Sequence, residues 1–200
     1  MRYLFILILG VLPMVGYSQR DGTKTMDFKK IDYRLLDSLI IVEINKVRDS
    51  LGHIHMNYSR VISDNITSPR CEILRREQHV YHPKGRENLF TTKVQTDLIK
   101  ESLKTYKFKG GDDVNDGFEI CLFKNQNYKL VTYGDYASSI VQLWCTSTDH
   151  AMVVRDAFGE QSVNDYPEIV MSGVSTKYGM WGGRNGFYAV LNLVRVIDFE

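Results

Sequence analysis

EIVMSGVSTKYGMWGGRNGFYAVLNLVRVI, residues 168–197, decides the fold class of this 200-residue chain. Its two ends, EIVMSGVST (168–176) and FYAVLNLVRVI (187–197), are rich in the β-branched and aromatic residues that favour strands. The glycine-rich GMWGGRNG (179–186) between them is typical of a turn. We therefore expect two strands, near 168–176 and 187–196, that pair in a central antiparallel sheet.

Helical patterns precede these strands. Between Asp32, which can cap a helix, and Gly52, which can end one, apolar residues recur at helical spacing: Leu36, Ile40, Ile44, Val47 and Leu51. A weaker pattern covers 61–76, where Pro69 is expected to start or kink a helix. A third long helix, capped by Asp135, carries Trp144, which we expect in the core. Helices first and strands late predict an α+β fold rather than alternating βαβ units.

A shorter pair of strand-like runs lies in the middle of the chain. FEICLF (118–123) and YKLVTY (128–133) flank the polar KNQN. Two apolar runs around a polar four-residue turn predict a β-hairpin over 118–133, at the periphery of the sheet.

The N-terminus has the layout of a secretory signal peptide. In MRYLFILILGVLPMVGYSQ, Arg2 precedes an apolar run, and the small residues Gly16 and Ser18 follow it. We expect cleavage after Ser18, so that residues 1–18 are removed and the secreted or periplasmic protein begins at Gln19. The apolar run is too short for a stable anchor, so no membrane span is expected in the mature chain.

The remaining sequence reads as a flexible leader, residues 19–31, followed by one domain, residues 32–200. Removal of residues 1–18 takes away Arg2 and no acid, so 25 basic and 24 acidic residues become 24 of each sign. A neutral chain without a basic block argues against nucleic acid or an anionic membrane as the main partner.

Three cysteines, Cys71, Cys121 and Cys145, would enter an oxidising compartment. Three cysteines there most simply form one disulfide and leave one free thiol. The sequence does not indicate which two of them pair. There is no C-x-x-C spacing, so neither a zinc knuckle nor a thioredoxin-type site is expected.

Four stretches, taken in order, resemble the CAP superfamily, which includes cysteine-rich secretory proteins, venom allergens and plant pathogenesis-related proteins. EINKVRDSLG (43–52) has the N-x-x-R-x-x-x-G spacing; VYHP (80–83) and RENLF (86–90) resemble the family histidine and its G-E-N-[LI] motif, with Arg86 where glycine is usual. LWCTSTDHAMVV (143–154) resembles the bacterial W-x-x-S-x-x-H, and the closing runs resemble the paired central strands. The resemblance spans about residues 33–194.

The resemblance implies a three-layer α/β/α sandwich around a central antiparallel sheet. Two departures accompany it. Residues 92–134 look like an insertion, which contains the predicted hairpin. We expect the domain to stay folded when about 108–134 is replaced by a short linker. The second glutamate of eukaryotic members is Ser147 here, as is common in the bacterial branch.

The family cleft would contain His82, Glu87 and His150, with Ser147 beside them. Two imidazoles and a carboxylate suit a divalent metal such as zinc, with an open position for water. Alternatives remain open, because Glu87 can instead fix its loop through backbone N–H groups and His79 is a rival to His82. A nucleophilic Ser147 is not supported, since no G-x-S-x-G motif is present.

The resemblance favours a secreted, non-enzymatic domain that binds a small apolar ligand or an extracellular protein partner. An alternative is a metal-dependent hydrolase, in which His82 and His150 hold the ion and Glu87 is the general base. A third possibility is an envelope interaction module whose cleft is vestigial and whose insertion makes the contact.

Overall fold

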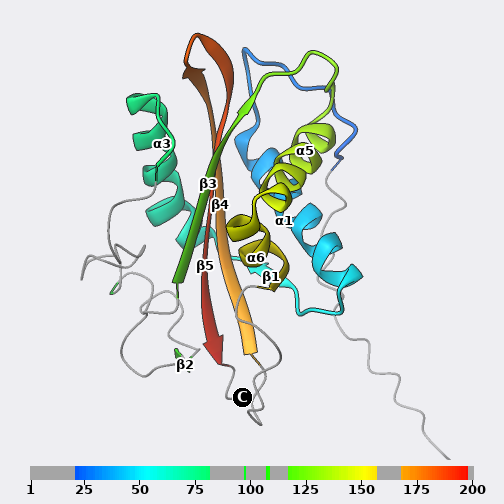
Figure 1. Cartoon of the computed structure of the whole chain (residues 1–200), viewed down its shortest axis with the longest axis vertical. Coiled ribbons are helices and arrows are strands. Elements are labelled where there is room, and N and C mark those ends of the chain that lie inside the picture. The colour runs from blue at the N-terminus through cyan, green and yellow to red at the C-terminus, as the bar shows by residue number, and fades with distance from the viewer. Residues whose placement is uncertain (1–20, 82–96, 98–106, 109–116, 157–167, 198–200) are drawn as a thin grey trace, which may run out of the picture.

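The computed structural model describes residues 21–81, 97, 107–108, 117–156 and 168–197. These residues build an α+β fold, as predicted, with helices on both faces of a five-stranded mixed sheet (Figure 1). The elements are α1 (Tyr33–Ser50), β1 (Met56–Tyr58), α2 (Arg60–Ile62), the π-helix η1 (Ser63–Thr67), α3 (Ser68–Glu77), β2 (Lys107–Phe108), β3 (Gly117–Asn125), α5 (Tyr133–Thr146), α6 (Thr148–Asp156), β4 (Glu168–Trp181) and β5 (Arg184–Ile197).

The predicted pair of late strands is confirmed as the long hairpin of β4 and β5. The two strands pair antiparallel from Glu168 opposite Ile197 to Trp181 opposite Arg184. Gly182 and Gly183 between them both have positive φ, which a two-residue turn of type I′ requires. The other edge of β4 pairs in parallel with β1, so the sheet is mixed rather than wholly antiparallel.

The predicted hairpin over 118–133 is wrong. Its first half is β3, which pairs antiparallel with β5 over residues 186–194. Its second half forms no strand, because Thr132 and Asp135 make a capping box that starts α5 at Tyr133. Thr132, rather than the predicted Asp135, is therefore the N-cap of this helix.

The other predicted helices are confirmed. The Asp32 side chain caps α1 by accepting a hydrogen bond of 3.0 Å from the Leu35 backbone N–H, and Gly52 follows the helix with a φ of 72°. Pro69 lies in the first turn of α3, where the missing N–H of proline costs nothing. The weaker pattern before it forms α2 and η1.

The helices cover opposite faces of the sheet. α1, α5 and α6 lie on one face and enclose the larger core, which includes Trp144 with no exposed surface (Figure 1). α3 lies on the other face, over a smaller core that contains Cys71, Cys121 and Tyr188. Within the described ranges, no helix is both long and apolar enough to cross a membrane.

Residues 21–31, which the sequence assigned to a flexible leader, are instead attached to the domain. The Met26 N–H donates to the Val131 carbonyl at 2.9 Å, and the Tyr133 N–H donates to the Lys24 carbonyl at 3.0 Å. Met26 is only 6% exposed and belongs to the larger core. Its apolar side chain anchors a stretch whose polarity otherwise suggested a loose leader.

Candidate functional site

His150 and Ser147 are the two predicted cleft residues that the structure describes. His150 lies in the first turn of α6 on the same side as the buried Val153 and Val154, and is itself half-buried. Ser147 joins α5 to α6, and its carbonyl accepts a hydrogen bond of 2.7 Å from the Ala151 N–H. His82 and Glu87 lie outside the described residues, so the convergence of the three predicted side chains stays a prediction.

The N-x-x-R motif of α1 holds the surrounding elements together. Arg48, which is 2% exposed, donates from Nε to the Ile54 carbonyl at 2.6 Å and from Nη1 to the Val154 carbonyl at 3.2 Å. Asn45 exchanges two hydrogen bonds with the backbone of Met56, at 3.0 and 2.8 Å. Arg48 therefore fixes the end of the helix that carries His150.

A metal centre is not visible in the described part of the chain. Among these residues, no group of three His, Cys, Asp or Glu side chains lies close enough to hold an ion. The zinc site expected from the sequence also needs His82 and Glu87, which lie outside the described residues, so this site stays a prediction.

The structure describes all three cysteines, and it joins none of them in the expected disulfide. Cys71 donates from Sγ to the Tyr188 carbonyl at 3.3 Å, and Cys121 to the Tyr81 carbonyl at 3.7 Å. Burial raises the pKa of the Cys121 thiol to about 12, and that of Cys71 well above its usual range. Both behave as core residues rather than reactive thiols.

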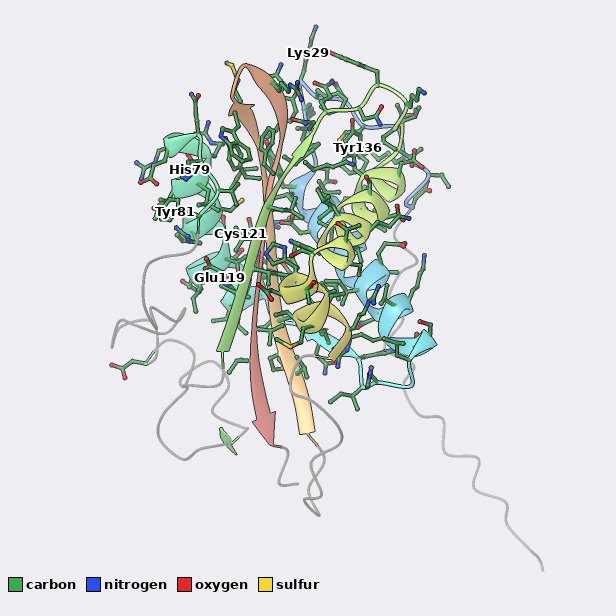
Figure 2. All side chains as sticks on the ribbon, viewed as in Figure 1. Lys29, His79, Tyr81, Glu119, Cys121 and Tyr136 are labelled. Carbon is green, nitrogen blue, oxygen red and sulfur yellow. The ribbon has the colours of Figure 1, made fainter. Side chains whose placement is uncertain are left out.

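A half-buried polar cluster lies beside these thiols, on the side of β3 that α3 covers. Figure 2 shows Tyr81, Cys121 and Glu119 along this side. Arg70 pairs with Glu119 at 2.9 Å, with side-chain exposures of 13% and 14%, and donates to the Tyr81 carbonyl at 2.6 Å. The Asn192 amide donates to Glu119 at 3.3 Å, so this cluster ties α3, β3 and β5 to the residue before His82. No sequence pattern singled it out.

The structure also contains a pocket of about 420 Å³ that the sequence did not predict. It opens where β4 continues beyond the three-residue β1, between the start of α1 and the α2–η1 segment. The lining residues are Ile31, Asp32, Tyr33, Arg34, Asp37, Tyr58, Arg60, Ser63, Asp64, Ser68, Ser175 and Lys177. Most of these side chains are charged or carry a hydroxyl, so the pocket is polar.

Three of these side chains take the place of a neighbouring strand at the edge of β4. The Ser63 hydroxyl donates to the Val174 carbonyl at 2.7 Å. Asp37 accepts from the Thr176 hydroxyl at 2.7 Å, and the Tyr33 hydroxyl accepts from the Tyr178 N–H at 3.3 Å. These contacts fall on alternate residues of β4, where an edge strand presents its unpaired backbone groups.

Close packing keeps this edge compact. A Cβ atom at Gly173 would lie 2.6 Å from the Ser63 backbone nitrogen, so glycine lets η1 approach β4. Asp37 is almost fully buried at the bottom of the pocket, and this burial raises the pKa of its carboxyl well above the usual range, although the hydrogen bond from Thr176 opposes the shift.

Comparisons with known proteins identify no family for this chain. No family model matches it, and no curated protein matches it. Among solved structures, an outer surface protein from Borrelia burgdorferi is similar, with a TM-score of 0.47 and 13% sequence identity, over 86% of this chain and 98% of that one. At this score the likeness supports neither a family nor a function.

Proposed function

We propose that this chain is an exported CAP-type domain that binds an extracellular ligand or protein partner and is not an enzyme. The observation that carries the proposal is the position of His150, half-buried in the first turn of α6 on its packed side. A histidine in this position can contact a ligand while the helix stays packed.

The CAP-type assignment draws support from how the motif residues are used. Arg48 of the first motif bonds to the Val154 carbonyl, at the end of the stretch that carries the W-x-x-S-x-x-H motif. Trp144 of that motif is fully buried beneath the helices. Helices on both faces of the sheet agree with the three-layer α/β/α arrangement that we propose for the whole domain.

The proposed binding cleft combines His150 with His82 and Glu87. Tyr81, the residue before His82, is held by Arg70 through its carbonyl, and the Arg70 guanidinium lies 4.7 Å from the centre of its ring. This anchoring fixes the point from which the chain continues to His82. A ligand or partner would contact the imidazoles directly or through a bound divalent ion.

Metal analysis and lipid extraction of the purified mature protein test this proposal, with wild type beside His150→Ala. His55→Ala, which changes an exposed histidine paired with Asp49, is the matched control. We expect His150→Ala alone to reduce the amount of co-purified ligand or ion. Equal material in all three proteins would contradict a role for His150. Metal-dependent ester or peptide hydrolysis that His150→Ala abolishes would favour the hydrolase instead.

A further inference from the structure

Three segments that are far apart in the sequence meet at one end of the molecule, which we call the loop end (Figure 1). They are residues 27–30, 126–129 and 180–185. The Gln126 N–H donates to the Asn185 carbonyl at 2.7 Å, which joins the second segment to the third. The Phe28 ring centre lies 5.3 Å from that of Tyr178, so the first segment packs beside the end of β4.

The loop end carries concentrated positive charge. Its exposed basic residues are Lys29, Lys30, Lys129 and Arg184, and Figure 2 shows Lys29 at this end of the molecule. Asp27 is the acidic residue of the three segments, and its carboxylate accepts a hydrogen bond of 2.9 Å from the Lys29 backbone N–H. Among the described residues, no ion pair involves any of the four basic side chains. Their charge is therefore available to an external anion.

The acidic residues that flank the loop end along the chain are engaged elsewhere. The Asp32 carboxylate caps α1 and lies 3.9 Å from the Lys24 ammonium. The Asp135 carboxylate accepts hydrogen bonds from the backbone N–H groups of Val131 and Thr132, at 3.0 and 2.8 Å. These carboxylates therefore leave the four cations unpaired.

Apolar side chains are exposed among these cations. Tyr128 is 86% exposed, Met180 is 49% exposed and Trp181 is 37% exposed. The Trp181 ring packs edge-on against Phe123, with 5.3 Å between ring centres, so contact with the fold orients this indole. Tryptophan and tyrosine combine an apolar ring with a polar group, and they favour the interface between a membrane and water.

The sequence did not reveal this surface. After the expected cleavage the chain carries equal numbers of basic and acidic residues, which argued against an anionic membrane as the main partner. The fold gathers basic and apolar residues from separate segments at one end. Positive charge alone would suit any polyanion, but the exposed apolar side chains favour a bilayer, which offers both anionic headgroups and an apolar phase.

We propose that the loop end binds the surface of an anionic phospholipid bilayer. Its basic side chains contact the headgroups, and Tyr128, Met180 and Trp181 enter the interfacial layer. Each cation close to an anionic surface strengthens binding about fivefold. The contact is peripheral and reversible, and it needs no spanning helix. None of the residues of the loop end belongs to α6, so this surface is separate from the proposed cleft.

Co-sedimentation of the full mature chain with lipid vesicles tests the proposal. One set of vesicles contains phosphatidylcholine and phosphatidylglycerol, and the other contains phosphatidylcholine alone. We expect at least about tenfold tighter binding to the anionic vesicles, weakening as salt is raised. Equal binding to both sets, or binding to neither, would overturn the proposal. Heparin, a soluble polyanion, should compete only weakly. Tighter binding to heparin than to the anionic vesicles would indicate a polyanion site and would also overturn the proposal.

Two charge variants locate the contact. The loop-end variant removes three of the cations at this surface: Lys29→Gln, Lys129→Gln and Arg184→Gln. The control variant removes three exposed cations outside the loop end: Lys46→Gln, Arg60→Gln and Arg155→Gln. We expect the loop-end variant to bind anionic vesicles at least about tenfold more weakly than wild type, and the control to bind within about twofold. Equal losses in the two variants would show that net charge alone drives binding, against the proposal.

Tryptophan fluorescence tests whether the apolar side chains enter the bilayer. The chain has two tryptophans, and Trp144 has no exposed surface. Bromine atoms on lipid chains quench an indole on contact, so anionic vesicles with brominated phosphatidylcholine should quench wild type. Trp181→Phe keeps an aromatic ring, and it should bind but lose the quenching. Bound wild type without quenching would contradict the proposal.

Two further measurements keep these outcomes interpretable. Thermal unfolding checks that each variant is folded, and the wild-type measurements decide the proposal even where a variant is not. His150→Ala should bind anionic vesicles like wild type, so a failure of the proposed cleft leaves this result unchanged. Loss of vesicle binding in folded His150→Ala would place the membrane contact at α6 and overturn the assignment to the loop end.

Discussion

The fold buries the carboxyl group of Asp37 at the edge of β4. This burial raises the pKa of the carboxyl group well above the usual range. The folded protein therefore holds this proton to a higher pH than the unfolded chain, in which an aspartic acid has a pKa of about 3.9. The stability that this group contributes is fully present below the unfolded-state pKa, and it is lost as pH rises through the folded-state pKa.

The effect of Asp37→Asn on stability should therefore depend on pH. At about pH 4 both proteins carry a mostly neutral side chain here, and we expect similar midpoints of urea unfolding. At about pH 8 the wild type should have lost stability relative to the variant, because an amide cannot ionise. Asp27→Asn, at an exposed carboxyl group, is the matched control. A difference between wild type and Asp37→Asn that is constant with pH would contradict this account.

The three thiols should differ in reactivity. Cys145 is partly exposed, whereas Cys71 and Cys121 are buried and have raised pKa values. We expect a disulfide reagent to modify Cys145 first in the native protein, and all three thiols after unfolding in urea. Cys145→Ser should remove the fast phase. Fewer than three thiols in the unfolded, unreduced wild type would instead indicate that a disulfide had formed.

At the scale of elements, Arg48 of α1 bonds to the segment just before β1 and to α6. Replacing it with methionine removes the Arg48 donors from the Ile54 carbonyl and from the buried Val154 carbonyl. We expect Arg48→Met to lower the free energy of unfolding by about 3 kcal/mol, measured by urea unfolding. Lys46→Met, on the same helix but exposed and paired with the adjacent Glu43, should change the free energy of unfolding by less than about 1 kcal/mol. Equal effects would show that the Arg48 bonds do not hold α6.

The same scale shows why some elements were predictable from sequence. α1 and the β4–β5 hairpin carry their start, periodicity and end signals within one short stretch, and each was predicted within a few residues. β3 was not assigned to its partner, because pairing with β5 joins residues about 70 apart and leaves no local signal. The alternation of residues 128–133 was strand-like, but the capping box of Thr132 and Asp135 overrode it.

The residues of the candidate sites were likewise predictable only where the sequence signal is local. His150 could be singled out from the sequence because the W-x-x-S-x-x-H motif is local, and the structure places this residue in the first turn of α6. The β4-edge pocket could not, since its central contact joins Asp37 to Thr176 across 139 residues. The half-buried pair of Arg70 and Glu119 likewise joins two segments whose separate patterns indicated only a helix and a strand.

At the scale of the whole molecule, the contacts of β3 argue against the expectation that residues 108–134 can be deleted from a folded domain. Within that range, β3 pairs with nine consecutive residues of β5. Its Ile120 and Leu122 are 2% and 7% exposed and belong to the larger core. The β5 edge of the central hairpin is therefore paired with a strand from the segment that the sequence analysis treated as an insertion.

Deletion of residues 108–134 with a short linker should therefore abolish cooperative unfolding, because it exposes the edge of β5 and removes part of the core. Point variants distinguish the effect of changing a buried side chain from the effect of shortening the chain. Ile120→Asp places a charge in the core and should prevent folding or lower the unfolding midpoint strongly. Tyr128→Asp, at a residue 86% exposed in the same range, should unfold like wild type. Circular dichroism during thermal unfolding measures both, and a cooperative transition in the deletion variant would return this segment to the status of an insertion.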